Sequence, residues 1–296
     1  MRIVALGDLH YYQLFTAPWN LVGKRVLGQM NLWLRRRKAF VPDALSPAIE
    51  HAISLSPDLF LFTGDLTTTA LRPEFEHVRR VLKPVLDRFP ALIIPGNHDR
   101  YTLTATRRRR IESFFPEHVP DTFPHARRLM EGWQLLAVDS AVPRFINARG
   151  RCGEAQLARM RNLIDHTTNP DALIVMCHYP AMLPPWINDK TGHRLDDAPD
   201  LRDVLRNAAP RKIVCLHGHV HRPWLFQPEE TGLSHLTFIN AGAPCRVSEP
   251  YPFGQGFWEI ELDTPNRAPG HCVKLRHHVP RAPRRWEIDQ NHGLDR

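Results

Sequence analysis

The feature that most constrains the fold is the stretch 92–100, which reads Leu-Ile-Ile-Pro-Gly-Asn-His-Asp-Arg. Its apolar run ends at a Pro-Gly turn, which predicts a short buried strand. Asn97, His98 and Asp99 follow the turn at once. In sheets with helices on their faces, ligands bind beyond the carboxyl ends of strands. These three side chains are therefore expected at the rim of a binding site.

The same construction, an apolar run followed by polar ligand-type residues, recurs along the chain. The first run ends in Asp8 and His10, which point the same way on an extended segment because they are two residues apart. A second run ends in Asp65, and a third reaches His178. A fourth ends at His217 and is followed by His219 and His221. The sequence thus predicts several strands that deliver their polar residues to one edge.

Segments with helical character lie between these strands, which indicates a layered α/β architecture. Helices are predicted over 48–56, 74–89, 104–115 and 154–166, with Pro84 kinking or splitting the second one. The strands nearer the C-terminus are closely spaced, which favours antiparallel pairing. No fixed-period repeat and no convincing linker interrupt the chain. We expect one domain over 1–280, followed by a Pro- and Arg-rich tail over 281–296 that is extended or mobile.

Composition narrows the possible class of protein. The 296 residues are 43% hydrophobic and 24% charged, and the formal net charge of +8 favours an anionic partner. Five cysteines without CxxC spacing argue against a disulfide framework and a zinc knuckle. The apolar run near the N-terminus is too short for a signal peptide, and no run approaches the roughly 18 residues of a membrane span. We expect a cytoplasmic protein, with contact to the inner face of a membrane left open.

An unusual segment at about 14–40 follows Asp8 and His10. Apolar residues recur in it at near-helical spacing and basic residues accompany them, which predicts a basic amphipathic insertion. Its most informative residues are Val22, Met30, Trp33, Arg35, Arg36 and Arg37. Packing of the apolar stripe on the domain is favoured over contact with a membrane surface or a lipid, which remains the alternative.

Nine residues at the predicted strand ends could bind metal ions. They are Asp8, His10, Asp65, Asn97, His98, His178, His217, His219 and His221. Mixed imidazole and oxygen donors suit zinc, manganese or iron better than calcium. A histidine at a strand end is more often structural than a ligand, so the collective placement carries the prediction.

The motifs together resemble the calcineurin-like metallophosphoesterase family. They stand in the family's order as Asp8-Leu-His10, Gly64-Asp65, 96–99 (Gly-Asn-His-Asp), His178 in Met-Cys-His-Tyr-Pro, and 218–221 (Gly-His-Val-His). The resemblance implies a four-layer β-sandwich of two mixed sheets flanked by helices. It also implies a hydrolase for phosphoric esters or anhydrides with two divalent metal ions, whose identity stays open among Mn, Zn and Fe.

Carried over by motif, the seven expected ligands divide into two groups. Asp8, His10 and His221 resemble the ligands of one ion. Asn97, His178 and His219 resemble those of the other. Asp65 would bridge the two ions, so that both could engage one phosphoryl group. His217 lies outside the Gly-His-x-His pattern and is expected to support the site rather than to bind metal.

The resemblance also implies a mechanism in which a metal-bound hydroxide attacks the phosphorus atom. His98 would stabilise the developing charge or protonate the leaving group. Asp99 would hold the His98 ring in its tautomer, or else would cap the turn; the two roles are equally supported. Asn240 is expected to support the metal site, and Arg246 to reach the substrate.

Three functions remain open from the sequence. The insertion favours a lipid-linked nucleotide substrate, because the chain looks similar to chlamydial-type UDP-2,3-diacylglucosamine hydrolases of lipid A synthesis. The alternative is a phosphodiesterase for cyclic nucleotides or other small diesters. A scaffold of the same fold without metal is the third, although every expected ligand position is filled. Nucleic acid is disfavoured, since the arginine runs carry no interleaved aromatic residues that could stack on bases.

Overall fold

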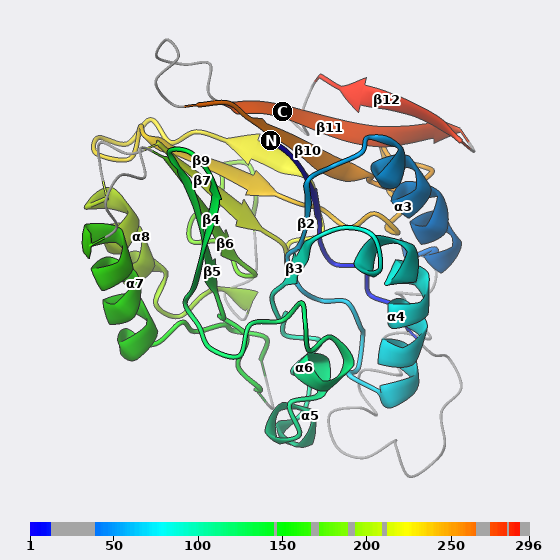
Figure 1. Cartoon of the computed structure of the whole chain (residues 1–296), viewed down its shortest axis with the longest axis horizontal. Helices are drawn as coiled ribbons and strands as arrows, with labels where there is room; N and C mark the ends of the chain where they lie inside the picture. Colours follow the sequence, from blue (N-terminus) through cyan, green and yellow to red (C-terminus); the bar gives the residue numbers. More distant parts are fainter. Residues whose placement is uncertain are drawn as a thin grey trace.

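The computed structural model describes residues 1–12, 39–144, 147–166, 172–188, 193–208, 212–264, 273–282 and 284–290. Two six-stranded sheets lie face to face between two groups of helices (Figure 1). Helices α3 and α4 cover one outer face, and α7 and α8 cover the other (Figure 1). This is the predicted sandwich of two mixed sheets flanked by helices.

The first sheet has the strand order β12-β11-β10-β1-β2-β3. Its strands are β1 (Arg2–Leu6), β2 (Leu59–Phe62), β3 (Ala91–Ile93), β10 (Phe257–Leu262), β11 (Val273–Ala282) and β12 (Arg285–Asp289). Strands β1, β2 and β3 run parallel, whereas β10, β11 and β12 pair antiparallel. The carboxyl ends of β1, β2 and β3 therefore lie next to one another at the same end of the sheet.

The second sheet has the order β4-β5-β6-β7-β9-β8. Its strands are β4 (His125–Met130), β5 (Trp133–Val138), β6 (Ala172–Cys177), β7 (Lys212–His217), β8 (Trp224–Phe226) and β9 (Leu236–Asn240). Four adjacent strands, β5, β6, β7 and β9, are parallel, and antiparallel strands close both edges.

Alternation along the strands divides the apolar residues into layers. On β1, Ile3 and Ala5 point into the core between the sheets, while Val4 and Leu6 face the helices outside. Because successive side chains of a strand point to opposite faces, a continuous apolar run is needed where both faces are covered. This explains why the central strands contain almost no polar residues before they end.

The helices are α3 (Leu45–Ser54), α4 (Arg72–Leu86), α5 (Leu103–Arg107), α6 (Arg110–Phe114), α7 (Glu154–His166) and α8 (Ala198–Arg206), with a 3₁₀ turn η3 (Pro42–Ala44) before α3. Pro84 lies inside α4 without splitting it, which corrects the expected interruption. Among the described residues no helix is both long and apolar enough to cross a membrane.

The C-terminal region differs from the expected tail. Strand β11 continues to Ala282, and β12 pairs with it antiparallel at the sheet edge. Tyr251 donates a hydrogen bond to the Asp289 carboxylate at 2.9 Å, which ties β12 to the domain. The described residues thus belong to the sheet as far as Asp289, beyond the expected boundary at residue 280. Residues 291–296 lie outside the described part of the chain.

Candidate metal centre

The loops after the parallel strands bring the predicted residues to one rim. Asp8 and His10 follow β1, and their backbone N–H groups donate to the carbonyl oxygens of Gly64 and Asp65 at 3.0 and 2.9 Å. The loop after β1 is thus hydrogen-bonded to the loop after β2. The pairing of the strands continues past their ends and holds the two carboxylates in register.

Five of the seven expected ligands have positive φ angles. They are Asp8 (49°), His10 (47°), Asp65 (54°), His219 (71°) and His221 (54°). Residues other than glycine rarely adopt this conformation, which costs on the order of 1 kcal/mol or more at each position. Strain concentrated on these residues indicates that side-chain placement, rather than backbone stability, determines the loop conformations.

One group of donors gathers around His10. Its Nε2 atom lies 2.6 Å from Nε2 of His221 and 3.5 Å from Oδ2 of Asp65. Asp8 contributes Oδ1, which lies 3.6 Å from His221 Nε2. Ligand atoms of these four residues all lie within 4.8 Å of one another, so they can share one ion.

A second group gathers around Asn97. Its Oδ1 atom lies 3.1 Å from Nε2 of His178 and 3.0 Å from Nδ1 of His219. Asp65, His178 and His219 also bring ligand atoms within 4.8 Å of one another. The structure therefore brings together all seven residues, in the two groups that the motifs imply.

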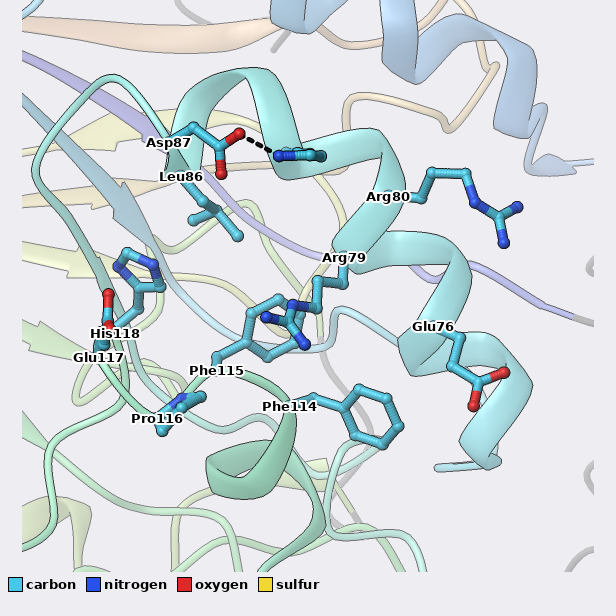
Figure 2. Close-up of a pocket in the computed structure, with 11 residues that line it drawn as sticks. Glu76, Arg79, Arg80, Leu86, Asp87, Phe114, Phe115, Pro116, Glu117 and His118 are labelled. Atoms are coloured by element: carbon cyan, nitrogen blue, oxygen red, sulfur yellow. Dashed lines mark hydrogen bonds and ion pairs between the residues drawn. The ribbon is translucent and has the colours of Figure 1, made fainter.

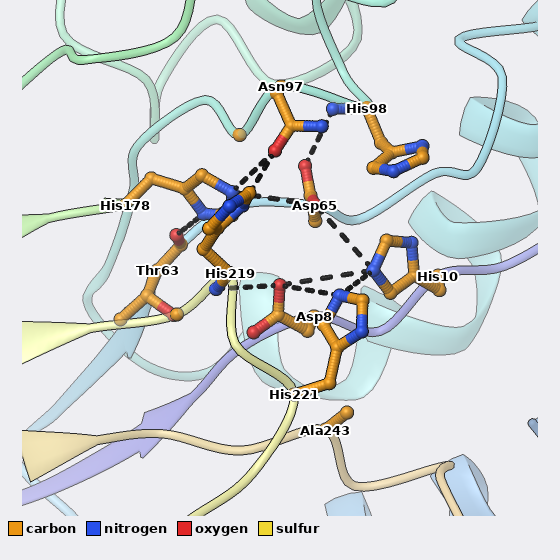
Figure 3. A network of polar contacts seen from close by, with 12 residues as sticks. Asp8, His10, Thr63, Asp65, Asn97, His98, His178, His219, His221 and Ala243 are labelled. Atoms are coloured by element: carbon orange, nitrogen blue, oxygen red, sulfur yellow. Dashed lines mark hydrogen bonds and ion pairs between the residues drawn. The ribbon is translucent and has the colours of Figure 1, made fainter. Parts of the chain in front are cut away.

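Asp65 lies between the groups, with His178 on one side and His10 on the other (Figure 3). Its Oδ2 atom is buried and lies 3.5 Å from Nε2 of both histidines, and no hydrogen-bond donor in the described structure satisfies it. A buried carboxylate oxygen without a donor is costly. A divalent cation on either side would satisfy this atom, so the donor set fits two metal ions.

Charges in this cluster shift one another's pKa values. Burial raises the pKa of Asp8 well above its usual range, although His178 opposes this. Burial also disfavours the charged form of Asp65, but the nearby imidazoles of His178 and His98 outweigh it and hold its pKa well below the usual range. Burial likewise opposes a proton on His178, but Asp65 raises its pKa to about 10. The carboxylates thus demand a positive charge at this place, and a metal ion can replace the proton.

Two glycines allow the loops to approach each other. A Cβ atom on Gly96 would lie 2.2 Å from Oδ1 and 2.3 Å from the backbone nitrogen of Asp65. Gly64 has a φ of +97°, and a Cβ there would lie 2.6 Å from the Gly96 nitrogen. Only glycine fits at either position, because a Cβ atom would displace Asp65 at Gly96 and the backbone of Gly96 at Gly64.

His98 lies beside the cluster, as predicted, but Asp99 does not hold it. The Nδ1 atom of His98 lies 2.6 Å from the carbonyl oxygen of Thr68. The Asp99 carboxylate instead accepts hydrogen bonds from the backbone N–H groups of Gly96, Thr67 and Leu66 at 3.0, 3.0 and 3.3 Å. The turn-cap alternative is therefore supported, and the tautomer-holding role expected for Asp99 belongs to a backbone carbonyl.

The supporting residues lie behind the ligands. His217 is buried, and its Nδ1 atom lies 3.0 Å from the Cys177 carbonyl oxygen. Asn240 donates to the Gly218 carbonyl oxygen at 2.5 Å and so braces the loop that carries His219 and His221. Arg246 donates to the His221 carbonyl oxygen at 2.7 Å. Arg246 thus supports a ligand loop, and its expected contact with substrate stays a prediction.

The C-terminal end of the insertion lies near the site. The ring of Phe40 is buried and lies 5.1 Å from the His10 ring and 5.5 Å from the His221 ring. Tyr12 donates to the Phe40 carbonyl oxygen at 3.4 Å. The residues predicted to form its apolar and basic faces lie outside the described residues: Val22, Met30, Trp33, Arg35, Arg36 and Arg37. Their role in binding lipid or packing on the domain stays a prediction.

The backbone makes contacts in the site that no side-chain motif predicted. The carbonyl oxygens of Thr63 and His193 lie 2.8 Å from His178 Nδ1 and 2.7 Å from His219 Nε2, respectively. These contacts orient the rings and leave the opposite nitrogen of each toward Asn97. No side-chain pattern signals such a role, because any residue type supplies a carbonyl group.

A cavity of about 520 Å³ lies beside α4, apart from the seven expected metal ligands. It lies between α4 and the segment 114–118, and Arg79 and Phe115 are among the residues that line it (Figure 2). The cavity is lined by none of the seven residues.

Comparison with known proteins agrees with this geometry. Residues 1–223 match the family model described as calcineurin-like phosphoesterase. The chain belongs to this family. The match confirms the resemblance drawn from the motifs and, with it, the class of metal-dependent phosphoester hydrolase.

The individual relatives share limited sequence identity with this chain. The chain is 27% identical over 209 residues to a probable cyclic nucleotide phosphodiesterase of Synechococcus, covering 70% of this chain and 73% of that protein. It is 28% identical over 186 residues to a cAMP/cGMP dual specificity phosphodiesterase of Mycobacterium tuberculosis, covering 60% of this chain but only 54% of that protein. A dimetal phosphatase from Danio rerio shares the fold, with a TM-score of 0.60 at 13% identity over 88% of this chain and 91% of that one.

Proposed function

We propose that this chain is a two-metal phosphodiesterase that hydrolyses small diesters of the cyclic-nucleotide class. The observation that carries the proposal is the Asp65 Oδ2 atom, which is buried, lacks a hydrogen-bond donor among the described residues, and lies 3.5 Å from a histidine of each group. A carboxylate in this position is suited to bridging two cations.

In this proposal Asp8, His10 and His221 hold one ion, Asn97, His178 and His219 hold the other, and Asp65 is shared. When bound, the two ions supply Lewis acidity that neutralises phosphoryl charge and makes a water molecule more acidic. Asn97 contributes an oxygen without adding negative charge, which keeps the site attractive to an anionic diester.

His98 is the proposed proton donor to the leaving oxygen. Its ring is half-buried and lies 4.7 Å from the His10 ring, so it borders the cluster without belonging to either group. Because the Thr68 carbonyl engages Nδ1, the nitrogen left to face a substrate is Nε2. A protonated ring at this place would stabilise charge on the leaving group and then release the proton to it.

The substrate class rests on the named relatives, both of which are described as cyclic nucleotide phosphodiesterases. The lipid-linked substrate depended on the insertion over 14–40, of which only residues 39 and 40 are described. Nothing in the described residues favours an acyl chain over a small diester, so the cyclic-nucleotide class is the better proposal.

The first test is metal-dependent hydrolysis of bis-p-nitrophenyl phosphate. Protein stripped with a chelator should be inactive, and Mn²⁺, Zn²⁺, Fe²⁺ or Co²⁺ should restore activity with about two ions bound per chain by elemental analysis. If none of the four ions gave hydrolysis, the metal-free scaffold would be the better assignment.

Variants test the assigned roles. Asn97→Ala should lower both activity and metal content, because it removes a proposed ligand. His98→Ala should lower activity by roughly 10²–10⁴-fold while both ions remain bound. His118→Ala is a matched control, because His118 is a half-buried histidine that lines the cavity of Figure 2. Loss of metal from His98→Ala would make His98 a ligand and refute its assignment as proton donor.

A further inference from the structure

The ring of Phe40 packs against both histidines of the first group of expected ligands. Its centroid lies 5.1 Å from that of His10 and 5.5 Å from that of His221, and the ring planes cross at 78° and 90°. Main-chain hydrogen bonds of 2.7 and 2.8 Å pair the segment 39–41 with the residues on either side of Arg246. Arg246 in turn donates to the His221 carbonyl oxygen at 2.7 Å. The position of the Phe40 ring is therefore fixed relative to the loop that carries His221.

The ring of Tyr179 occupies the corresponding place in the second group. Its centroid lies 5.2 Å from that of His178 and 4.1 Å from that of His219. The hydroxyl group donates to the Ala148 carbonyl oxygen at 2.5 Å, and a Cβ atom on Gly150 would lie 2.4 Å from the ring. The side chain is fully buried, so the surrounding protein determines where the ring lies.

A ring in either place limits a motion that a single hydrogen bond leaves open. Rotation of an imidazole about its bond to Cβ has broad energy minima, so one contact at a ring nitrogen does not by itself fix the tilt of the ring. A flat side chain packed against two imidazoles at once blocks this rotation and keeps water from the ligand nitrogens. Residues that hold the ligands of a metal ion in this way change its affinity by roughly 10–100-fold.

We propose that Phe40 and Tyr179 are positioning residues, each of which raises the affinity for one of the two metal ions. Phe40 acts on the ion of the first group, and Tyr179 acts on the ion of the second. The inference rests on the proposed two-metal function and assigns to each ion its own support in the surrounding protein. Because Phe40 ends the insertion at about 14–40, this end of the insertion serves metal binding whichever diester is the substrate.

The test replaces each ring by leucine, which retains apolar bulk without a flat ring. Zn²⁺ is titrated into the metal-free protein in competition with a chelator, and NMR of ¹⁵N-labelled histidine side chains follows the imidazole signals of each group separately. Phe40→Leu should raise the Kd of the first group by roughly 10–100-fold and that of the second by much less, since the groups share only Asp65. Tyr179→Leu should show the reverse pattern.

Two variants separate positioning from general stability. Tyr179→Phe keeps the ring but loses the hydroxyl group, and it should bind both ions with native affinity. Phe115→Leu makes the same change as Phe40→Leu at another buried residue of the same outer core, which lines the cavity of Figure 2. It should lower the midpoint of thermal unfolding without changing either Kd. If a leucine variant does not fold, Phe40→Met and Tyr179→Met repeat the test with a flexible apolar side chain.

Four results would overturn the inference. They are an unchanged Kd in the group that a ring variant should affect, equal weakening of both ions by one ring variant, weakening by Tyr179→Phe as large as by Tyr179→Leu, and weakening by Phe115→Leu. In each of them the native protein still binds two ions, so the proposed function stands. Failure of the proposed function looks different, since then the native protein binds none of Mn²⁺, Zn²⁺, Fe²⁺ and Co²⁺ and hydrolyses no diester, and the inference falls with it.

Discussion

Replacing Asp99 with alanine gives the sharpest test of how the motif loop is held. The Asp99 carboxylate accepts from three buried N–H groups, those of Gly96, Leu66 and Thr67, and from the Thr67 hydroxyl. Leaving a buried donor without an acceptor costs about 1–3 kcal/mol each. Water can partly replace the carboxylate, so each of the three N–H groups should cost a value near the lower end of that range. Asp99→Ala should therefore lower the free energy of unfolding by about 3–5 kcal/mol.

Two further variants remove only some of these hydrogen bonds and should lower the stability by smaller amounts. Asp99→Asn keeps one oxygen for Thr67 but turns an NH₂ group toward the N–H groups of Gly96 and Leu66, so we expect an intermediate loss of about 2–3 kcal/mol. Thr67→Val removes only the hydroxyl donor and should cost about 1 kcal/mol. Urea unfolding of the metal-free proteins, followed by circular dichroism, measures all three.

The competing role for Asp99 predicts a different pattern. If Asp99 oriented the His98 ring, Asp99→Asn would shift the pH dependence of hydrolysis and leave the free energy of unfolding almost unchanged. An Asp99→Ala protein within about 1 kcal/mol of the native stability would therefore refute the assignment as a turn cap.

Two other predictions concern the site and the opposite edge of the first sheet. Gly96→Ala should abolish metal binding, since its Cβ would lie 2.2 Å from Asp65 Oδ1; elemental analysis showing full occupancy would contradict the packing. His51, whose Nε2 lies 3.1 Å from Nδ1 of His278, has its pKa lowered to about 4 by burial and by His278. The unfolded chain then binds more protons between pH 6.5 and 4, so stability should fall as pH decreases through that window, by about 1–2 kcal/mol after solvent screening of this half-exposed ring. Urea unfolding at pH 7 and pH 4.5 should show a smaller loss for His51→Gln, and equal losses would remove His51 as the cause.

The helices and strands that could be predicted are those in which the apolar residues of the sequence pattern are also the buried residues of the structure. Helix α7 begins at Glu154 and ends at His166, as its periodicity predicts. The strands that lead to Asp8, Asp65 and His178 are apolar because both their faces are covered. Their identification depended only on where apolar runs stop.

The strands that the sequence did not predict lack this agreement between apolar pattern and burial. Strand β4 reads His-Ala-Arg-Arg-Leu-Met and lies at a sheet edge, where no residue of it is fully buried. Strand β12 follows prolines and arginines that are typical of a mobile tail, and it forms only because β11 offers a free edge. For Asp99, the sequence left two roles open, because the choice depends on which N–H groups the fold places around the carboxylate.

The site also shows why both sheets are needed. The first sheet supplies Asp8, His10, Asp65 and Asn97, and the second supplies His178, His219 and His221. His221 joins the group of Asp8, and Asn97 joins that of His178, so each group draws on both sheets. The apolar layer between the sheets holds the two rims at this spacing, together with polar contacts such as that of His178 Nδ1 with the Thr63 carbonyl oxygen at 2.8 Å. The fully buried Trp258 in that layer donates to the Asn240 carbonyl oxygen at 2.9 Å, beside the loop that carries His219 and His221. Ions that bind across the rims would bind the folded chain alone, and at a hundred times the dissociation constant such binding adds about 2.7 kcal/mol to stability. The packing of the sandwich core and the affinity for metal thus both depend on how the two sheets are placed against each other.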